Sequence, residues 1–215
     1  MGRPATTSPD AILEAGLAIG LRDLSVTAVA NRLGLTRAAV HRHVGGRQAL
    51  DELVGEHILG EAELPDRNDD PIEQYLERFA LWLRDLCASA PGLADYMLDE
   101  FPRSERSARL SEGVLAHLVA EGWNPVEGLL ISTTVATQAL ALARADTAGP
   151  ERAEATAAQT AALDSQPLLS QAWRSFGAVD SDTRFRWFIH CNVAGVLANS
   201  PAGSEHLEPG DEPEP

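Results

Sequence analysis

The stretch that decides the fold is Ser25-Val26-Thr27-Ala28-Val29-Ala30-Asn31-Arg32-Leu33-Gly34-Leu35-Thr36-Arg37-Ala38-Ala39-Val40-His41-Arg42-His43-Val44. Ser25 and Thr36 each suit the N-cap of a short helix, and Gly34 suits the end of the first one. Apolar residues recur at helical spacing on the inner side of both helices, for example at Val29 and Val40. Two short helices joined by a tight turn predict a helix-turn-helix.

The outer face of the second of these helices is expected to enter the major groove of DNA. Arg37 and Arg42 would reach guanine or phosphate, and the small Ala38 would meet a thymine methyl group. Arg47, at the start of the next helix, is expected to hold a phosphate together with the free N–H groups of that helix. The predicted DNA-binding residues are Thr27, Thr36, Arg37, Ala38, His41, Arg42, His43 and Arg47. His41 and His43 would also make half of a metal site, but no third ligand lies nearby in the sequence.

The distribution of charge supports this interpretation although the net charge of −15 argues against it at first. All 17 basic residues are arginines. Residues 1–64 hold six of them against eight acids, whereas residues 65–215 hold eleven against 24 acids. Residues 24–50 carry four arginines and no acid, which makes them the basic island of an otherwise acidic chain.

Residues 34–44, followed by Arg47-Gln48-Ala49-Leu50, resemble the head of the TetR family of bacterial repressors. The resemblance is close over residues 10–64 and continues more weakly through residues 113–146 and 164–198. It implies an all-α fold, with a three-helix head and a helical C-terminal domain that dimerises through a four-helix bundle. In that family a Tyr commonly occupies the place of His41 and a Lys that of Arg47. Because of the first difference, the family's aromatic phosphate contact is not carried over to His41, whereas the second difference keeps the charge.

The remaining sequence has helical periodicity nearly throughout. Leu13, Leu17 and Leu21 mark the expected inner side of a first helix that begins after Ser8. The polar stretch 64–71 predicts a boundary between a helix-turn-helix domain, 1–64, and an effector-binding and dimerisation domain, 65–200. Body helices are expected from Pro71 to the Pro91-Gly92 break, at 93–100, at 104–121, from Pro125 to about Ala145, from Pro167, and from Ser181 to Ala198. Residues 151–163 suit a helix or an ordered loop equally, and 201–215 predict a disordered acidic tail.

Two apolar stripes predict a homodimer, because a monomer would expose them. They are Val135, Ala139 and Leu142 on the helix from Pro125, and Ile189, Val193 and Val196 on the last helix. The chain has neither a signal-peptide pattern nor a run of eighteen apolar residues, so we expect a cytoplasmic protein with no membrane partner. Cys87 and Cys191 are expected to be buried, inert thiols.

The C-terminal domain is expected to bind a small organic effector between its helices. Polar Thr133, Thr137 and Gln138 interrupt an otherwise apolar helix, and a ligand could supply the partners that buried polar groups need. The predicted effector-binding residues are Phe79, Trp82, Met97, Phe101, Leu118, Thr133, Thr137 and Gln138. Tetracycline repressors chelate a magnesium–drug complex with a His ahead of an Arg-Pro turn. Residues 96–101 hold no His, so neither a metal nor any other cofactor is expected.

These features together predict a ligand-responsive transcriptional regulator, most readily a repressor, that binds a palindromic DNA operator as a homodimer and is released by its effector. The alternative is a similar DNA-binding dimer controlled by a protein partner. An enzyme is the third class, but the sequence holds no Gly-rich phosphate loop, no Gly-x-Ser-x-Gly and no His-Glu-x-x-His, so no catalytic residue is proposed.

Overall fold

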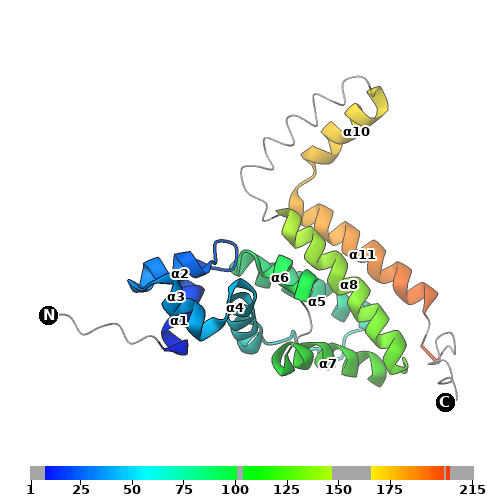
Figure 1. Cartoon of the computed structure of the whole chain (residues 1–215). Helices are drawn as coiled ribbons and strands as arrows, with labels where there is room; N and C mark the ends of the chain where they lie inside the picture. Colours follow the sequence, from blue (N-terminus) through cyan, green and yellow to red (C-terminus); the bar gives the residue numbers. More distant parts are fainter. Residues whose placement is uncertain (1–7, 101–103, 147–165, 201, 204–215) are drawn as a thin grey trace, which may run out of the picture.

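The computed structural model describes residues 8–100, 104–146, 166–200 and 202–203, and its regular elements there are all helices. Four of them, α1 (Pro9–Ile19), α2 (Val26–Leu33), α3 (Arg37–Val44) and α4 (Arg47–Glu61), form a compact unit, here called the head (Figure 1). The others form the body: α5 (Ile72–Ser89), α6 (Leu93–Glu100), α7 (Glu105–Ala120), α8 (Pro125–Asp146), α10 (Pro167–Ala178) and α11 (Ser181–Asn199).

The helices of the head begin and end where local chemistry dictates. Ser8, Ser25 and Thr36 each cap a helix, their side-chain oxygens accepting from the backbone N–H three residues on, at 3.2, 3.0 and 3.2 Å. Gly34 ends α2 in the left-handed conformation, with φ of 66°. The predicted starts of α2 and α3, at Ser25 and Thr36, and the predicted end of α2, at Gly34, are therefore confirmed. The α3 helix then packs on α1 and α2 through its fully buried Val40.

The inner side of α1 differs from the prediction. Leu17 is exposed and Leu13 is only partly buried, whereas Ile12, Ala15 and Gly16 face the core and Leu21 is buried just beyond the helix. Gly16 explains the rotation, because a Cβ on it would lie 2.6 Å from a methyl group of Val54 on α4. The close approach of α4 selects the face of α1 that carries the smallest residues.

Helix α8 is the centre of the body and packs against α5, α6, α7 and α11. By length and composition it is the one helix among the described residues that could cross a membrane. Its position explains that composition, since Ile131, Val135, Ala139, Leu140 and Ala143 are all buried against neighbouring helices of the same chain. The apolar character of α8 is that of a core helix.

The predicted dimer stripes are wrong in their detail. Val135 and Ala139 on α8, and Ile189 and Val193 on α11, are buried within one chain because α8 and α11 pack against each other. Leu142 and Val196 are partly buried against the same core. The apolar side chains that the chain exposes on these helices are others, including Leu130 (48% exposed) and Trp187 (61% exposed).

Helix α10 stands apart from the rest of the body, attached near the start of α11 (Figure 1). None of its twelve residues is buried, and Leu168, Trp173 and Phe176 are exposed. Near the C-terminal end of α10, the guanidinium carbon of Arg184 on α11 lies 5.1 Å from the centroid of the Phe176 ring. Phe101, residues 151–163 and, apart from residues 202–203, the predicted tail 201–215 lie outside the described residues.

Candidate DNA-binding face and effector cavity

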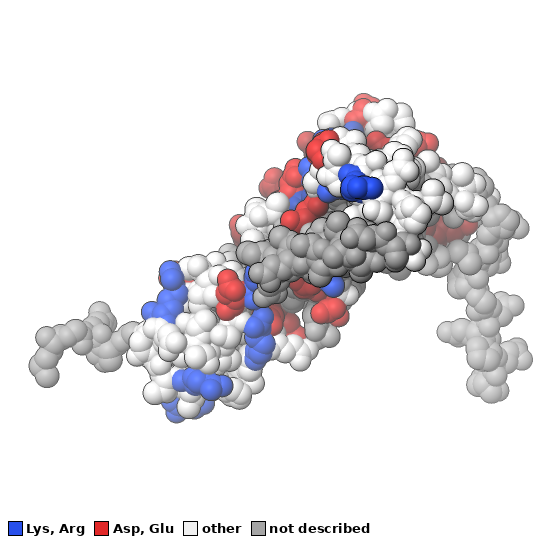
Figure 2. All heavy atoms as spheres, turned by 90° about the horizontal axis from the view of Figure 1, so that it is seen from above, with Lys and Arg blue, Asp and Glu red and all other residues white. Residues whose placement is uncertain are grey.

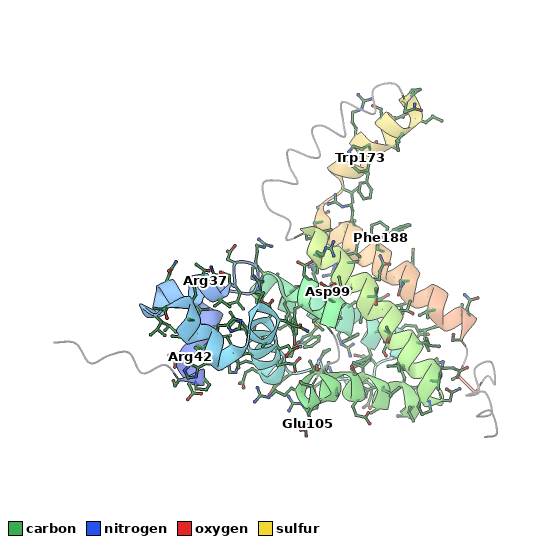
Figure 3. The ribbon with its side chains drawn as sticks, viewed as in Figure 1. Arg37, Arg42, Asp99, Glu105, Trp173 and Phe188 are labelled. Atoms are coloured by element: carbon green, nitrogen blue, oxygen red, sulfur yellow. The ribbon has the colours of Figure 1, made fainter. Side chains whose placement is uncertain are left out.

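The predicted recognition face is presented by α3. Arg37, Ala38, His41, Arg42 and His43 are all exposed, because the helix turns its opposite side inward. Figure 3 shows Arg37 and Arg42 extending from the head. Figure 2 shows blue side chains on the head, while red ones are spread over the body. The basic island of the sequence is thus an exposed surface in the folded chain.

A shallow groove of about 620 Å³ joins this face to the start of α2. Thr27 lies on the α2 side of the groove, and Arg37, Ala38 and His41 lie on the α3 side. Thr36 is exposed but its hydroxyl group caps α3, so its side chain fixes the start of the recognition helix. The structure therefore brings Thr27 together with the α3 residues, as a surface that reads DNA requires.

Arg47 lies differently from the prediction. Its guanidinium group donates to both carboxylate oxygens of Asp51, at 2.8 and 2.5 Å, and to the backbone carbonyls of Leu21 and Leu24. It therefore joins the start of α4 to the turn between α1 and α2. The side chain is still 52% exposed and borders the groove. No side chain caps α4 at Gly46, so its first N–H groups remain available to an anion.

A cavity of about 220 Å³ lies in the body among α5, α6, α7 and α8. Five of the predicted effector residues line it: Phe79, Trp82, Met97, Thr133 and Thr137. Of the other three, Leu118 is fully buried in the core, Gln138 is not part of the lining, and Phe101 lies outside the described residues. Sequence reasoning missed several lining residues, among them Leu98, Ser111, Val114, Leu129 and Ser132.

Helix α6 connects this cavity to the head. Met97 lines the cavity, and the neighbouring Tyr96 places its ring on Gly55 of α4. The Tyr96 hydroxyl donates to Glu56 Oε1 at 2.8 Å, and the other oxygen of Glu56 accepts from Ser104, the cap of α7. One carboxylate on α4 thus holds two helices of the body.

A second contact joins the head to the turn before α6. The backbone N–H of Arg22 donates to the carbonyl of Pro91 at 3.1 Å. Gly92 permits this approach, because its φ is +98° and a Cβ there would lie 2.5 Å from the Arg22 nitrogen. The turn between α1 and α2 therefore rests directly on the turn between α5 and α6.

The two cysteines differ from each other. Cys87 is buried on α5, and burial raises the pKa of its thiol to about 12, so it is held as the unreactive thiol. Cys191 is exposed on α11, which corrects the expectation that both are buried. His41 and His43 lie on the exposed face of α3, and among the described residues no group of three His, Cys, Asp or Glu side chains could hold a metal ion.

The chain combines a helix-turn-helix head with a helical body that contains an open cavity. Solved structures share this fold. No family model and no curated protein matches the sequence. The TetR family protein ActR of Streptomyces coelicolor, in complex with (S)-DNPA, has a TM-score of 0.75 at 24% identity, over 91% of this chain and 100% of that one.

Two further structures agree. ActR in complex with actinorhodin gives a TM-score of 0.74 at 24% identity, over 93% of this chain and 100% of that one. A variant of TetR from Acinetobacter baumannii AYE, in complex with minocycline, gives 0.66 at 20% identity, over 94% of this chain and 99% of that one. The chain therefore has the all-α fold of the TetR-family regulators over nearly its whole length.

Proposed function

We propose that this chain is a TetR-type transcriptional regulator that binds DNA through α3, acts as a homodimer in the cytoplasm, and responds to a small organic molecule in the body cavity. The observation that carries the proposal is the exposed face of Arg37, Ala38, His41 and Arg42 on a capped helix of a helix-turn-helix head. Nothing in the proposal requires a catalytic step or a cofactor.

Exposed apolar side chains support the homodimer. Leu130 on α8 and Trp187 on α11 lie on the two helices that are paired in the core, and their outward faces would be buried by a second copy. A two-fold dimer would present two α3 helices to successive major grooves, about 34–36 Å apart. The operator should therefore be a palindrome with that half-site spacing.

The cavity in the body supports the proposed response to a small organic effector. Complexes of ActR with (S)-DNPA and actinorhodin, and of TetR with minocycline, show that proteins of this fold hold small molecules. In this chain the cavity borders α6, and α6 contacts the head through Tyr96. A ligand that favours one arrangement of α6 would thereby change the spacing of the two heads. We propose repression that the effector relieves.

The second candidate is a regulator whose DNA binding is controlled by a protein partner. The exposed surface of α10 favours this candidate. Leu168 (83% exposed), Trp173 and Phe176 give α10 an exposed apolar surface that the described part of the chain does not cover. Such a surface suits a protein contact. In that case DNA binding would be the same, but the cavity would have no regulatory role.

The test begins with the selection of bound DNA from a random pool by the full-length protein. The wild type should enrich a palindrome, and Arg37→Ala should then weaken binding to it by about 1–3 kcal/mol and relax the preference at one base pair of each half-site. Arg174→Ala removes the same charge from α10 and is the matched control. Equal binding by the wild type and Arg37→Ala would show that α3 is not the recognition helix.

A further inference from the structure

The lining of the body cavity points to the chemical class of its ligand, an inference that rests on the proposed function. Its deep side is apolar, formed by buried Phe79, Leu83, Met97, Leu110 and Val114. The described residues around it contribute no charged side chain. A charged ligand would lose its water shell on entering this apolar site and would gain no counter-ion from these residues, so its binding would be unfavourable.

The polar groups of the cavity are hydroxyls, and they lie at one side. Thr133 and Thr137 stand four residues apart on α8, which places them on one face with Cβ atoms about 6 Å apart. Both are exposed, so they lie at the mouth, whereas the deep side is apolar. The Ser132 hydroxyl donates to the Leu129 carbonyl within α8, but the structure gives the hydroxyls of Thr133 and Thr137 no partner among the described residues.

Two aromatic side chains line the cavity. Phe79 and Trp82 on α5 stack on each other, with ring centroids 5.9 Å apart and planes inclined by 21°. A further aromatic ring packs well against aromatic side chains, in offset-stacked or edge-to-face geometry. A planar ring system is therefore favoured over a puckered aliphatic one of equal volume.

The volume sets the size of the ring system. A cavity of about 150 Å³ lined by apolar side chains holds benzene. The volume here, about 220 Å³, exceeds that by enough for a second fused ring. It lies below the range of about 300–1,000 Å³ that drug-sized ligands fill.

We propose that the cavity binds an uncharged, planar, two-ring aromatic compound with a hydroxyl or carbonyl group on one edge. The rings enter first and lie against Phe79 and Trp82, and the polar edge faces Thr133 and Thr137 at the mouth. The bound compound exchanges hydrogen bonds with these threonine hydroxyls. Its charge state and its planarity together determine selectivity.

Isothermal titration calorimetry of the full-length protein with four two-ring probes of similar size tests the proposal. The probes are 2-naphthol, naphthalene-2-carboxylate, 2-naphthylmethylammonium and decahydro-2-naphthol. We expect 2-naphthol to bind at least about tenfold more tightly than each of the other three. Equal or tighter binding of the carboxylate or the ammonium compound would overturn the inference of neutrality, and equal binding of decahydro-2-naphthol would overturn that of planarity.

A pair of isosteric variants tests the orientation. Thr137→Val should weaken 2-naphthol about three- to tenfold and leave naphthalene unchanged, because only the hydroxyl contact is lost. Thr134→Val is the matched control. Thr134 lies three residues before Thr137 on α8 but outside the cavity lining, and its hydroxyl donates to the Leu130 carbonyl within the helix. Equal effects of the two variants would overturn the proposed orientation.

The DNA experiment on the same preparation separates this inference from the proposed function. A protein that enriches a palindrome but binds none of the four probes would overturn the inference and leave DNA binding intact. A protein that binds 2-naphthol with the expected selectivity but enriches no DNA would support the inference and overturn the proposed function.

Discussion

The contact between Gly55 on α4 and the ring of Tyr96 on α6 allows a sharp test of how the head is held on the body. We expect Gly55→Ala to destabilise the protein although alanine is the better helix former. A Cβ on Gly55 would lie 2.6 Å from Tyr96 Cε1 and 2.8 Å from Cδ1 and Cζ. Carbon atoms normally approach to about 3.5–4.0 Å, so the ring or the helix must move by about 1 Å.

The magnitude follows from two opposing effects. Inserting a methyl group into a packed contact costs about 1–3 kcal/mol. Replacing glycine by alanine within a helix stabilises by about 0.5–1 kcal/mol. At the middle of these ranges the net loss is about 1 kcal/mol, which corresponds to a fall in Tm of about 2–4 °C for a chain of this length. DNA affinity should fall as well, because Tyr96 also holds Glu56 and the position of α4 depends on both contacts.

Urea denaturation and fluorescence anisotropy with labelled operator measure these two effects. The matched control is Gly177→Ala in α10, where nothing lies within 4 Å of the added Cβ. A double-mutant cycle with Tyr96→Ala identifies the cause, because in that background Gly55→Ala should be neutral or stabilising. The reasoning is refuted if Gly55→Ala is as stable as the wild type, or if its cost is the same with and without the Tyr96 ring.

Three further outcomes follow from the structure. Of the two partners expected for Arg42, guanine and phosphate, we predict phosphate, so Arg42→Ala should weaken binding to all DNA sequences alike and reduce the salt slope by about one, measured by anisotropy at several salt concentrations; an unchanged slope with a relaxed sequence preference would place Arg42 on a base. Trp187→Glu should give monomers by light scattering, and an unchanged dimer mass would place the interface elsewhere. Burial, with the nearby Arg67, lowers the pKa of His117 below 6.5, so the unfolded chain takes up a proton more readily than the folded one. Stability should therefore fall as the pH drops below 6.5, and His117→Gln should reduce that fall in urea denaturation at pH 7.5 and 5.5; identical pH dependence would contradict this.

The head could be predicted from the sequence because its helices are delimited by local interactions. Ser25, Gly34 and Thr36 act on backbone groups within a few residues, so their roles are readable from sequence alone. The inner face of α1 could not be predicted in the same way. It depends on the close approach of Val54 to Gly16, which is a contact between distant parts of the chain.

Apolar periodicity also failed to separate contacts within a chain from contacts between chains. Val135 and Val193 have the spacing of an interface, but α8 and α11 bury them against each other in one chain. Arg47 is a different case, because Asp51 follows at i+4 and such pairs are common on helices. That signal was present in the sequence and predicts the ion pair that the structure shows.

Some of the cavity residues could be predicted from local sequence, and others depend on contacts between distant parts of the chain. Thr133 and Thr137 could be predicted because polar side chains interrupt an apolar helix. Ser111 lies on the inner face of α7 with the buried Leu110 and Val114, but a single serine at such a position does not by itself indicate a cavity, and the packing of α7 on α8 brings it there. The apolar lining residues carry no signal that distinguishes a cavity wall from filled core.

Helix α6 is the element through which a ligand in the cavity could change the position of the head and so the affinity for DNA. It carries Met97 into the cavity and Tyr96 onto α4, and the turn before it, at Gly92, supports the backbone of Arg22. The two contacts hold the head at separate points, on α4 and on the turn between α1 and α2. A ligand that binds one arrangement about a hundredfold more tightly shifts the balance by about 2.7 kcal/mol. That exceeds the net cost of about 1 kcal/mol expected for one methyl group at Gly55, so such a ligand supplies enough free energy to disturb the contact between Tyr96 and α4.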